Sequence, residues 1–99
     1  LMLLRTLIVE DNGIAAIYLK KQLEQIGAED IEIVMSGEEA VQKASSCEFD
    51  VIFMDIRLKG EMDGIEAAGI ILGHKPVRLI FLTGNSDLPT KERALQLNP

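Results

Sequence analysis

Three apolar runs of this sequence, residues 7–9, 51–54 and 79–82, are each followed by polar side chains that could do chemistry. These side chains are Glu10 and Asp11, Asp55, and Thr83. If the runs are neighbouring parallel strands, their carboxyl ends place three carboxylates and a hydroxyl in one crevice. Carboxylates within ~5 Å of one another repel by roughly 3 kcal/mol per pair at an effective dielectric near 20, so the cluster needs a cation. Hard divalent ions prefer oxygen ligands, and Mg²⁺ is the ion that we predict.

The composition limits the classes of protein to which the chain could belong. Ninety-nine residues predict a single domain, and the net charge of −6 argues against direct binding to nucleic acid or to an anionic membrane. The single cysteine, Cys47, excludes an internal disulfide, and we interpret it as a small buried residue. No apolar run is long enough to span a bilayer, and residues 1–4 lack the features of a signal peptide. We therefore expect a soluble, cytoplasmic protein.

Strand and helix signals alternate along the chain, which is typical of a parallel sheet connected by helices. The strand signals cover residues 3–9, 31–35, 51–54 and 79–82. The first run is almost entirely apolar and predicts a central strand. Glu32 interrupts the second run, which predicts an edge strand.

Capping residues predict where the helices begin and end. The first helix should begin near Asn12, bury a stripe of apolar side chains and end at Gly27, which can adopt a left-handed conformation; the stripe consists of Ala16, Leu19, Leu23 and Ile26. Two capping boxes, Ser36 with Glu39 and Asp63 with Glu66, predict the starts of the second and third helices. Gly73 and Pro76 should end the third helix, and a fourth should run from Asp87 or Pro89 through Leu95.

A sheet that ended at residues 79–82 would leave a long apolar edge unpaired, which natural proteins usually cover. We therefore interpret residues 1–99 as one domain that is incomplete at its C-terminus. Two copies of the chain could cover the edge by forming a homodimer, and light scattering would test this.

Four short motifs resemble the receiver domain of bacterial two-component response regulators. They are Val9-Glu10-Asp11-Asn12, Phe53-Met54-Asp55-Ile56, Met62-Asp63-Gly64-Ile65-Glu66 and Leu82-Thr83-Gly84-Asn85. The resemblance covers nearly all of the chain. It implies an α/β, flavodoxin-like, doubly wound parallel sheet with strand order 2-1-3-4-5, of which the fifth strand and fifth helix have no counterpart in this sequence.

The resemblance also implies a role for each site residue. Asp55 would accept a phosphoryl group from a histidine kinase or a histidine phosphotransfer protein. Glu10, Asp11, Asp55 and the backbone carbonyl of Arg57 would hold Mg²⁺. Thr83 would be the switch hydroxyl, and Gly84 would donate its backbone N–H to the phosphate. Such a domain is a signalling phosphoacceptor that catalyses only its own phosphorylation and dephosphorylation, and carboxylates are known nucleophiles for this chemistry.

The sequence departs from the common receiver pattern in two places. The stretch from Ile56 to Met62 is one residue longer than usual and lacks the usual proline. The family's fifth strand carries an aromatic switch residue and ends in a lysine that pairs with the phosphoryl group. No residue of this chain matches either of them.

Other interpretations remain open from the sequence. The chain could be a pseudo-receiver, a protein-interaction module that is never phosphorylated. A phosphohydrolase of the haloacid-dehalogenase type would need an Asp where Arg57 stands, and a dinucleotide site would need a glycine-rich turn where Glu10 and Asp11 stand.

The acidic residues could also be ordinary helix caps and turn residues. We expect His74 to lie exposed at a helix end, and we assign it no function.

Overall fold

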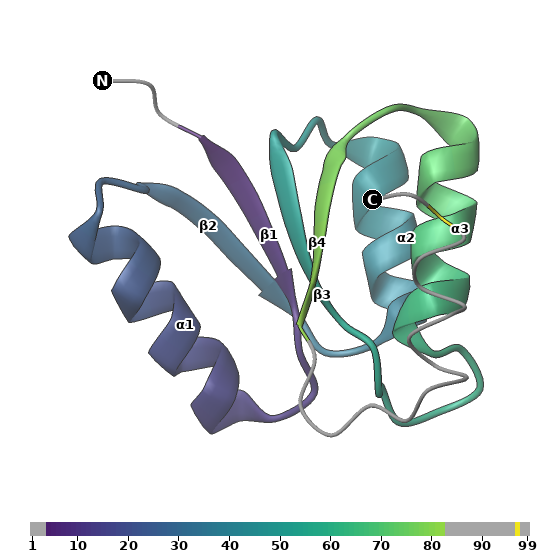
Figure 1. Ribbon diagram of the computed structural model, residues 1–99, viewed down its shortest axis with the longest axis horizontal. Helices are drawn as coiled ribbons and strands as arrows, with labels where there is room; N and C mark the ends of the chain where they lie inside the picture. The colour runs from purple at the N-terminus through teal and green to yellow at the C-terminus, as the bar shows by residue number, and fades with distance from the viewer. Residues whose placement is uncertain (1–3, 83–96, 98–99) are drawn as a thin grey trace.

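The computed structural model describes residues 4–82 and residue 97, and these form a three-layer α/β domain (Figure 1). Strands and helices alternate along the chain as β1 (Arg5–Val9), α1 (Gly13–Gln25), β2 (Asp30–Val34), α2 (Gly37–Ser46), β3 (Val51–Asp55), α3 (Gly64–His74) and β4 (Arg78–Leu82). Every pair of neighbouring strands is parallel, and the order in the sheet is β2-β1-β3-β4. The predicted doubly wound order is therefore confirmed.

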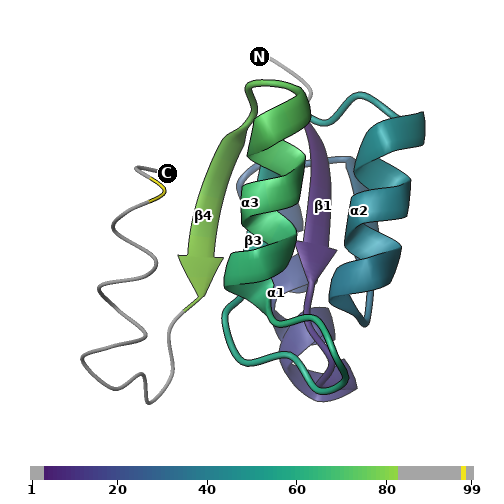
Figure 2. The same cartoon turned by 90° about the vertical axis from the view of Figure 1, so that its right-hand side faces the viewer.

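The helices cover the two faces of the sheet unequally. α1 lies on one face, and α2 and α3 lie side by side on the other (Figures 1 and 2). Among residues 4–82, β2 and β4 are the two end strands of the sheet. The predicted fourth helix lies outside the described residues, and the pairing of two copies through the outer edge of β4 stays a prediction.

The main core lies between the sheet and the pair α2 and α3. Leu7, Ile8 and Val9 of β1 are fully buried, as expected for a central strand. β2 contains no fully buried residue, which agrees with its predicted edge position. The buried core on the α2 and α3 side is built from Leu7, Val9, Ala40, Ala44, Ile52, Met54, Leu58, Ala67, Ala68, Ile71 and Leu79. Small alanines on both helices allow them to pack closely on the sheet.

The helix starts follow the predicted caps. Asn12 accepts hydrogen bonds from the backbone N–H groups of Ile14 and Ala15, and Asp63 forms a complete capping box with Glu66. At α2 only half of the predicted box forms. Ser36 accepts from the Glu39 backbone N–H, while the Glu39 carboxylate accepts from the Ser36 hydroxyl at 3.1 Å.

The predicted helix ends are confirmed, but the predicted apolar stripe of α1 is only partly buried. Gly27, just after α1, has a φ of 105°, and α3 ends at His74, between Gly73 and Pro76. Of the stripe, Ala16 is buried, Leu19 and Leu23 are half-buried, and Ile26, where the backbone leaves helical geometry, is 78% exposed.

The exposure of two single residues, His74 and Cys47, was also predicted from the sequence. His74 is exposed in the last turn of α3, where its predicted position is confirmed. Cys47 was predicted to be buried but is half-buried, because it is the extended residue that ends α2. In the described part of the chain, no helix combines the length and apolar character that crossing a bilayer requires.

Candidate functional site

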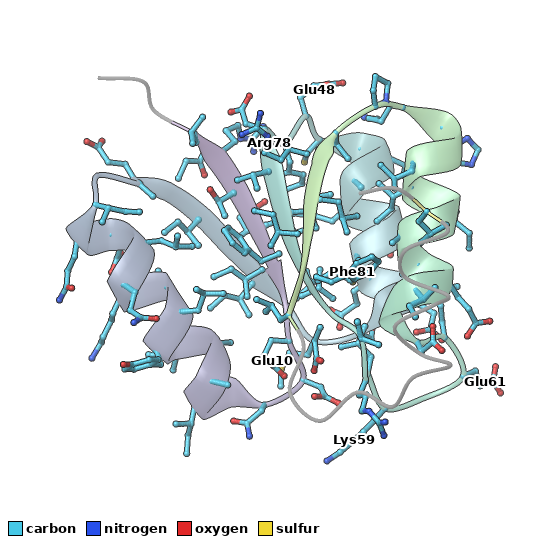
Figure 3. The ribbon with its side chains drawn as sticks, in the orientation of Figure 1. Glu10, Glu48, Lys59, Glu61, Arg78 and Phe81 are labelled. Carbon is cyan, nitrogen blue, oxygen red and sulfur yellow. The ribbon has the colours of Figure 1, made fainter. Side chains whose placement is uncertain are left out.

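The register of the strands brings the acidic residues together. Val9 of β1 pairs with Met54 of β3, so the next residues along the two strands, Glu10 and Asp55, lie beside each other at the carboxyl end of the sheet. Hydrogen bonding to β2 continues one residue further, since the Glu10 N–H donates to the Val34 carbonyl at 3.1 Å. In Figure 3 the Glu10 side chain lies at the lower end of the strands, at the opposite end from Glu48 and Arg78.

Three half-buried carboxylates form a cluster at this end. Glu10, Asp11 and Asp55 each offer one oxygen, and these oxygens all lie within 4.8 Å of one another. The three residues come from two strand ends that are 45 positions apart in the sequence, so only the sheet can assemble them. A cluster of like charges at this spacing is unfavourable unless protons or a cation compensate it.

Each of the three carboxylates accepts a hydrogen bond from a backbone amide. The Asn12 N–H donates to Glu10 Oε2 at 3.0 Å, and the Arg57 N–H donates to Asp55 Oδ1 at 3.1 Å. The third bond crosses the site, because the Lys59 N–H donates to Asp11 Oδ2 at 2.9 Å. A role for Lys59 was not predicted from the sequence, in which the glycine that follows it, Gly60, is a local signal of a turn.

The cluster strongly perturbs the titration of Glu10. Burial raises the pKa of Glu10 from its ordinary value of 4.5 to about 7; the Asn12 N–H opposes this rise, and the neighbouring Asp55 and Asp11 carboxylates add to it. Near neutral pH the Glu10 carboxyl group of the metal-free site is therefore partly protonated, and a bound cation would favour loss of this proton.

This raised pKa predicts how the stability of the metal-free domain depends on pH. The folded protein binds the Glu10 proton more tightly than the unfolded chain does, so the contribution to stability is complete below about pH 4.5 and is lost as pH rises through about 7. We expect the free energy of unfolding in urea, measured in chelator, to fall across this window, and we expect Glu10→Gln to remove most of that fall. Glu61→Gln, which removes an exposed carboxylate from the neighbouring loop, controls for the loss of one charge. If the free energy of unfolding depended on pH in the same way in Glu10→Gln and in the parent protein, the raised pKa would not belong to Glu10.

The loop between β3 and α3 passes very close to the backbone of Asp55. A Cβ on Gly64 would overlap the Asp55 carbonyl oxygen, and it would lie 2.8 Å from the carbonyl carbon of Asp55 and 2.9 Å from the Cα of Ile56. The Gly64 N–H donates to the Ile56 carbonyl at 2.9 Å. Glycine at this position therefore lets α3 start directly against the strand that carries Asp55.

The predicted roles of three further site residues, Thr83, Gly84 and Arg57, stay predictions. Thr83 and Gly84 lie outside the described residues, although they follow directly after Leu82, which pairs with Asp55. Arg57 is exposed in the β3–α3 loop, and the predicted role of its carbonyl as a metal ligand stays a prediction.

Comparisons with known proteins agree with this geometry. The family model for the response regulator receiver domain matches residues 6–98. The chain belongs to the receiver domain family. This assignment confirms the resemblance found in the sequence, and it does not favour the pseudo-receiver alternative, since the acidic residues of the site are present and lie together.

The receiver domain is similar to parts of larger proteins. It is 41% identical over 81 residues to protein-glutamate methylesterase/protein-glutamine glutaminase 2 from Carboxydothermus hydrogenoformans, covering 81% of this chain and 23% of that protein. It is 32% identical over 90 residues to the transcriptional regulatory protein PdtaR from Mycobacterium tuberculosis, covering 91% of this chain and 43% of PdtaR. The chain thus spans less than half the length of these curated relatives.

Solved structures of receiver domains superpose closely on this one. The receiver domain of a modulated diguanylate cyclase from Desulfovibrio desulfuricans matches with a TM-score of 0.90 and 39% identity, over 99% of this chain and 78% of that chain. The receiver domain of the sensor histidine kinase PA1611 from Pseudomonas aeruginosa, which has a magnesium ion coordinated in its active-site cleft, matches with a TM-score of 0.85 and 30% identity, over 97% of this chain and 80% of that chain.

The donor atoms of the cluster also fit Mg²⁺. Glu10, Asp11 and Asp55 supply carboxylate oxygens only, and no cysteine or histidine stands among them. Oxygen donors of this kind suit a hard divalent ion, which usually keeps several waters in such sites.

Proposed function

We propose that this receiver domain accepts a phosphoryl group on Asp55 in a two-component phosphorelay. The donor would be a histidine kinase or a histidine phosphotransfer protein. The observation that carries this proposal is the cluster of Glu10, Asp11 and Asp55, whose oxygens lie within 4.8 Å of one another at the carboxyl end of a parallel sheet. Ligands bind at this end of doubly wound sheets.

The reaction requires a nucleophile, a way to neutralise charge and donors for the transferred group. An Asp55 carboxylate oxygen attacks phosphorus, the P–N bond of the phosphohistidine breaks, and the imidazole leaves with the electron pair of that bond. Arg57 donates its backbone N–H to Asp55 Oδ1 and so fixes the rotation of the nucleophile. The Thr83 hydroxyl and the Gly84 N–H, which follow β4 in the chain, would donate to the phosphoryl oxygens.

Glu10, Asp11, Asp55 and the Arg57 carbonyl are the residues that we propose hold Mg²⁺. The ion would neutralise charge on the phosphoryl oxygens during transfer. The two separate carboxylates that follow β1, together with Asp55, would leave open positions for water and for the phosphoryl group.

The curated relatives carry their receiver domain within longer chains with different activities. We propose a signalling role in which phosphorylation of Asp55 changes the contacts of the domain with its partners, with no other catalytic activity of the domain itself.

Phosphorylation by a small donor tests the proposal. Incubation with acetyl phosphate and Mg²⁺ should add the mass of one phosphoryl group to the intact protein, and excess chelator should prevent the addition. Peptide mapping should place the group on Asp55. A domain that binds Mg²⁺ and still takes up no phosphoryl group from acetyl phosphate or from a phosphorylated phosphotransfer protein would indicate a pseudo-receiver.

A further inference from the structure

A backbone hydrogen bond from the β3–α3 loop holds one carboxylate of the acidic cluster. The Lys59 N–H donates to Asp11 Oδ2 at 2.9 Å across 48 positions of the sequence. We propose that Gly60, the next residue, is a positioning residue for the metal site, because its left-handed backbone turns the chain directly after Lys59 and so closes the loop in the place from which the Lys59 N–H reaches Asp11. This inference rests on the proposed function of the cluster as a Mg²⁺ site.

A glycine at position 60 suits the backbone conformation there; it is not needed to make room for a neighbouring atom. Its φ is 102°, in the region that residues with a side chain rarely adopt. A Cβ placed on it would meet no atom within 4 Å, which contrasts with Gly64 on the same loop. The feature of Gly60 that another residue cannot supply is therefore the direction in which it sends the chain.

The β3–α3 loop packs against the core on both sides of Gly60. Leu58 is 7% exposed and belongs to the main core, and Met62 packs against the same core. The backbone of Met62 also lies against α2, since a Cβ on Gly37 would be 3.0 Å from the Met62 carbonyl oxygen. Between these anchors Lys59, Gly60 and Glu61 are exposed, so Gly60 sets the path of the short exposed stretch.

The Lys59 side chain does not make the contact. Figure 3 shows it extending from the loop away from the sheet, at the same end of the molecule as Glu10. The hydrogen bond to Asp11 is made by the backbone amide of Lys59, so the identity of the residue at position 59 matters less than the orientation of its N–H. A carboxylate has two oxygens with about four lone-pair sites, so one amide donor can fix its rotation and leave capacity for a cation.

Partners that orient metal ligands from outside the coordination sphere contribute strongly to affinity. Their loss commonly weakens metal binding by about 10- to 100-fold. Gly60 would contribute to affinity as such a partner does. Through the Lys59 amide it would hold Asp11 in the rotamer that points its oxygens toward Glu10 and Asp55 before the ion binds.

Mg²⁺ titrations of matched variants, followed by backbone amide NMR shifts, test the proposal. Gly60→Ala should weaken Mg²⁺ binding by about tenfold, the lower end of the range for such partners. Gly73→Ala, which also adds a methyl group in open space but at an ordinary φ, should bind as the parent does. Gly60→Asn should recover part of the affinity, since Asn tolerates positive φ better than Ala.

Two variants at position 59 separate the amide from the side chain. Lys59→Ala keeps the backbone N–H and should not weaken Mg²⁺ binding, whereas Lys59→Pro deletes the N–H and should reproduce the loss seen in Gly60→Ala. The proline variant also keeps the test open if Gly60→Ala is too unstable to titrate. Unchanged affinity in a folded Gly60→Ala or Lys59→Pro protein overturns the inference. A parent protein that binds no Mg²⁺ would instead refute the proposed metal site itself.

Discussion

Replacing Asp55 with Asn should abolish phosphorylation of the domain, with a loss of at least about a hundredfold in the rate of labelling, as for other removed nucleophiles. The substitution keeps the size of the side chain but replaces the attacking carboxylate by an amide, whose oxygen is a poor nucleophile. It also removes one of the three carboxyl groups of the cluster. Intact mass spectrometry after incubation with acetyl phosphate and Mg²⁺ measures the effect.

A matched control is available eight residues along the chain. Asp63→Asn makes the same chemical change in the same loop region, and Asn serves equally well as the residue that caps α3. This variant should fold and take up the label as the parent does. Label that persists in Asp55→Asn would show that another residue is the acceptor.

Replacing Gly64 with Ala should destabilise the domain by about 3 kcal/mol or more, at the upper end of the costs of overpacking. The added methyl group would collide with the carbonyl group of Asp55 and with Ile56, which are backbone atoms of β3 and the start of the following loop. Backbone atoms held in a sheet cannot move aside as a side chain can. Either β3 or the start of α3 must shift, and both choices disturb Asp55.

Urea unfolding measures this cost. Gly73→Ala is the control, since its methyl group lies in open space in the last turn of α3, where Ala is a better helix former than Gly. We expect the control to be as stable as the parent or slightly more stable. A Gly64→Ala protein with the stability of the parent would mean that α3 can start further from Asp55 than the structure shows.

The local elements could be predicted because their signals act over a few residues. The Asp63 capping box joins residues three positions apart, and Gly27 adopts positive φ for a reason internal to glycine. The carboxyl ends of the strands were also predicted to within one residue, since each strand ends at or next to the last apolar residue of its run. The exposure of Ile26 was not predicted, because the last turn of α1 depends on which backbone groups find partners in the folded chain.

The sequence by itself named the residues of the candidate site. Four short motifs, which include Glu10, Asp11, Asp55 and Thr83, indicated the receiver family, and that resemblance implied the sheet order. The family match and the observed order β2-β1-β3-β4 confirm both. Side-chain chemistry is a property of the sequence, so the candidate oxygen ligands and the candidate nucleophile could be named in advance.

Only the tertiary structure decided how these residues lie relative to one another. The pairing of Val9 with Met54 sets Glu10 beside Asp55, and the Lys59 amide reaches Asp11 across 48 positions. The burial that raises the pKa of Glu10 to about 7 likewise comes from packing of distant segments. Contacts of this kind depend on strand register and on the path of one loop. Both are set by the packing of the whole core, and no short stretch of the sequence encodes them.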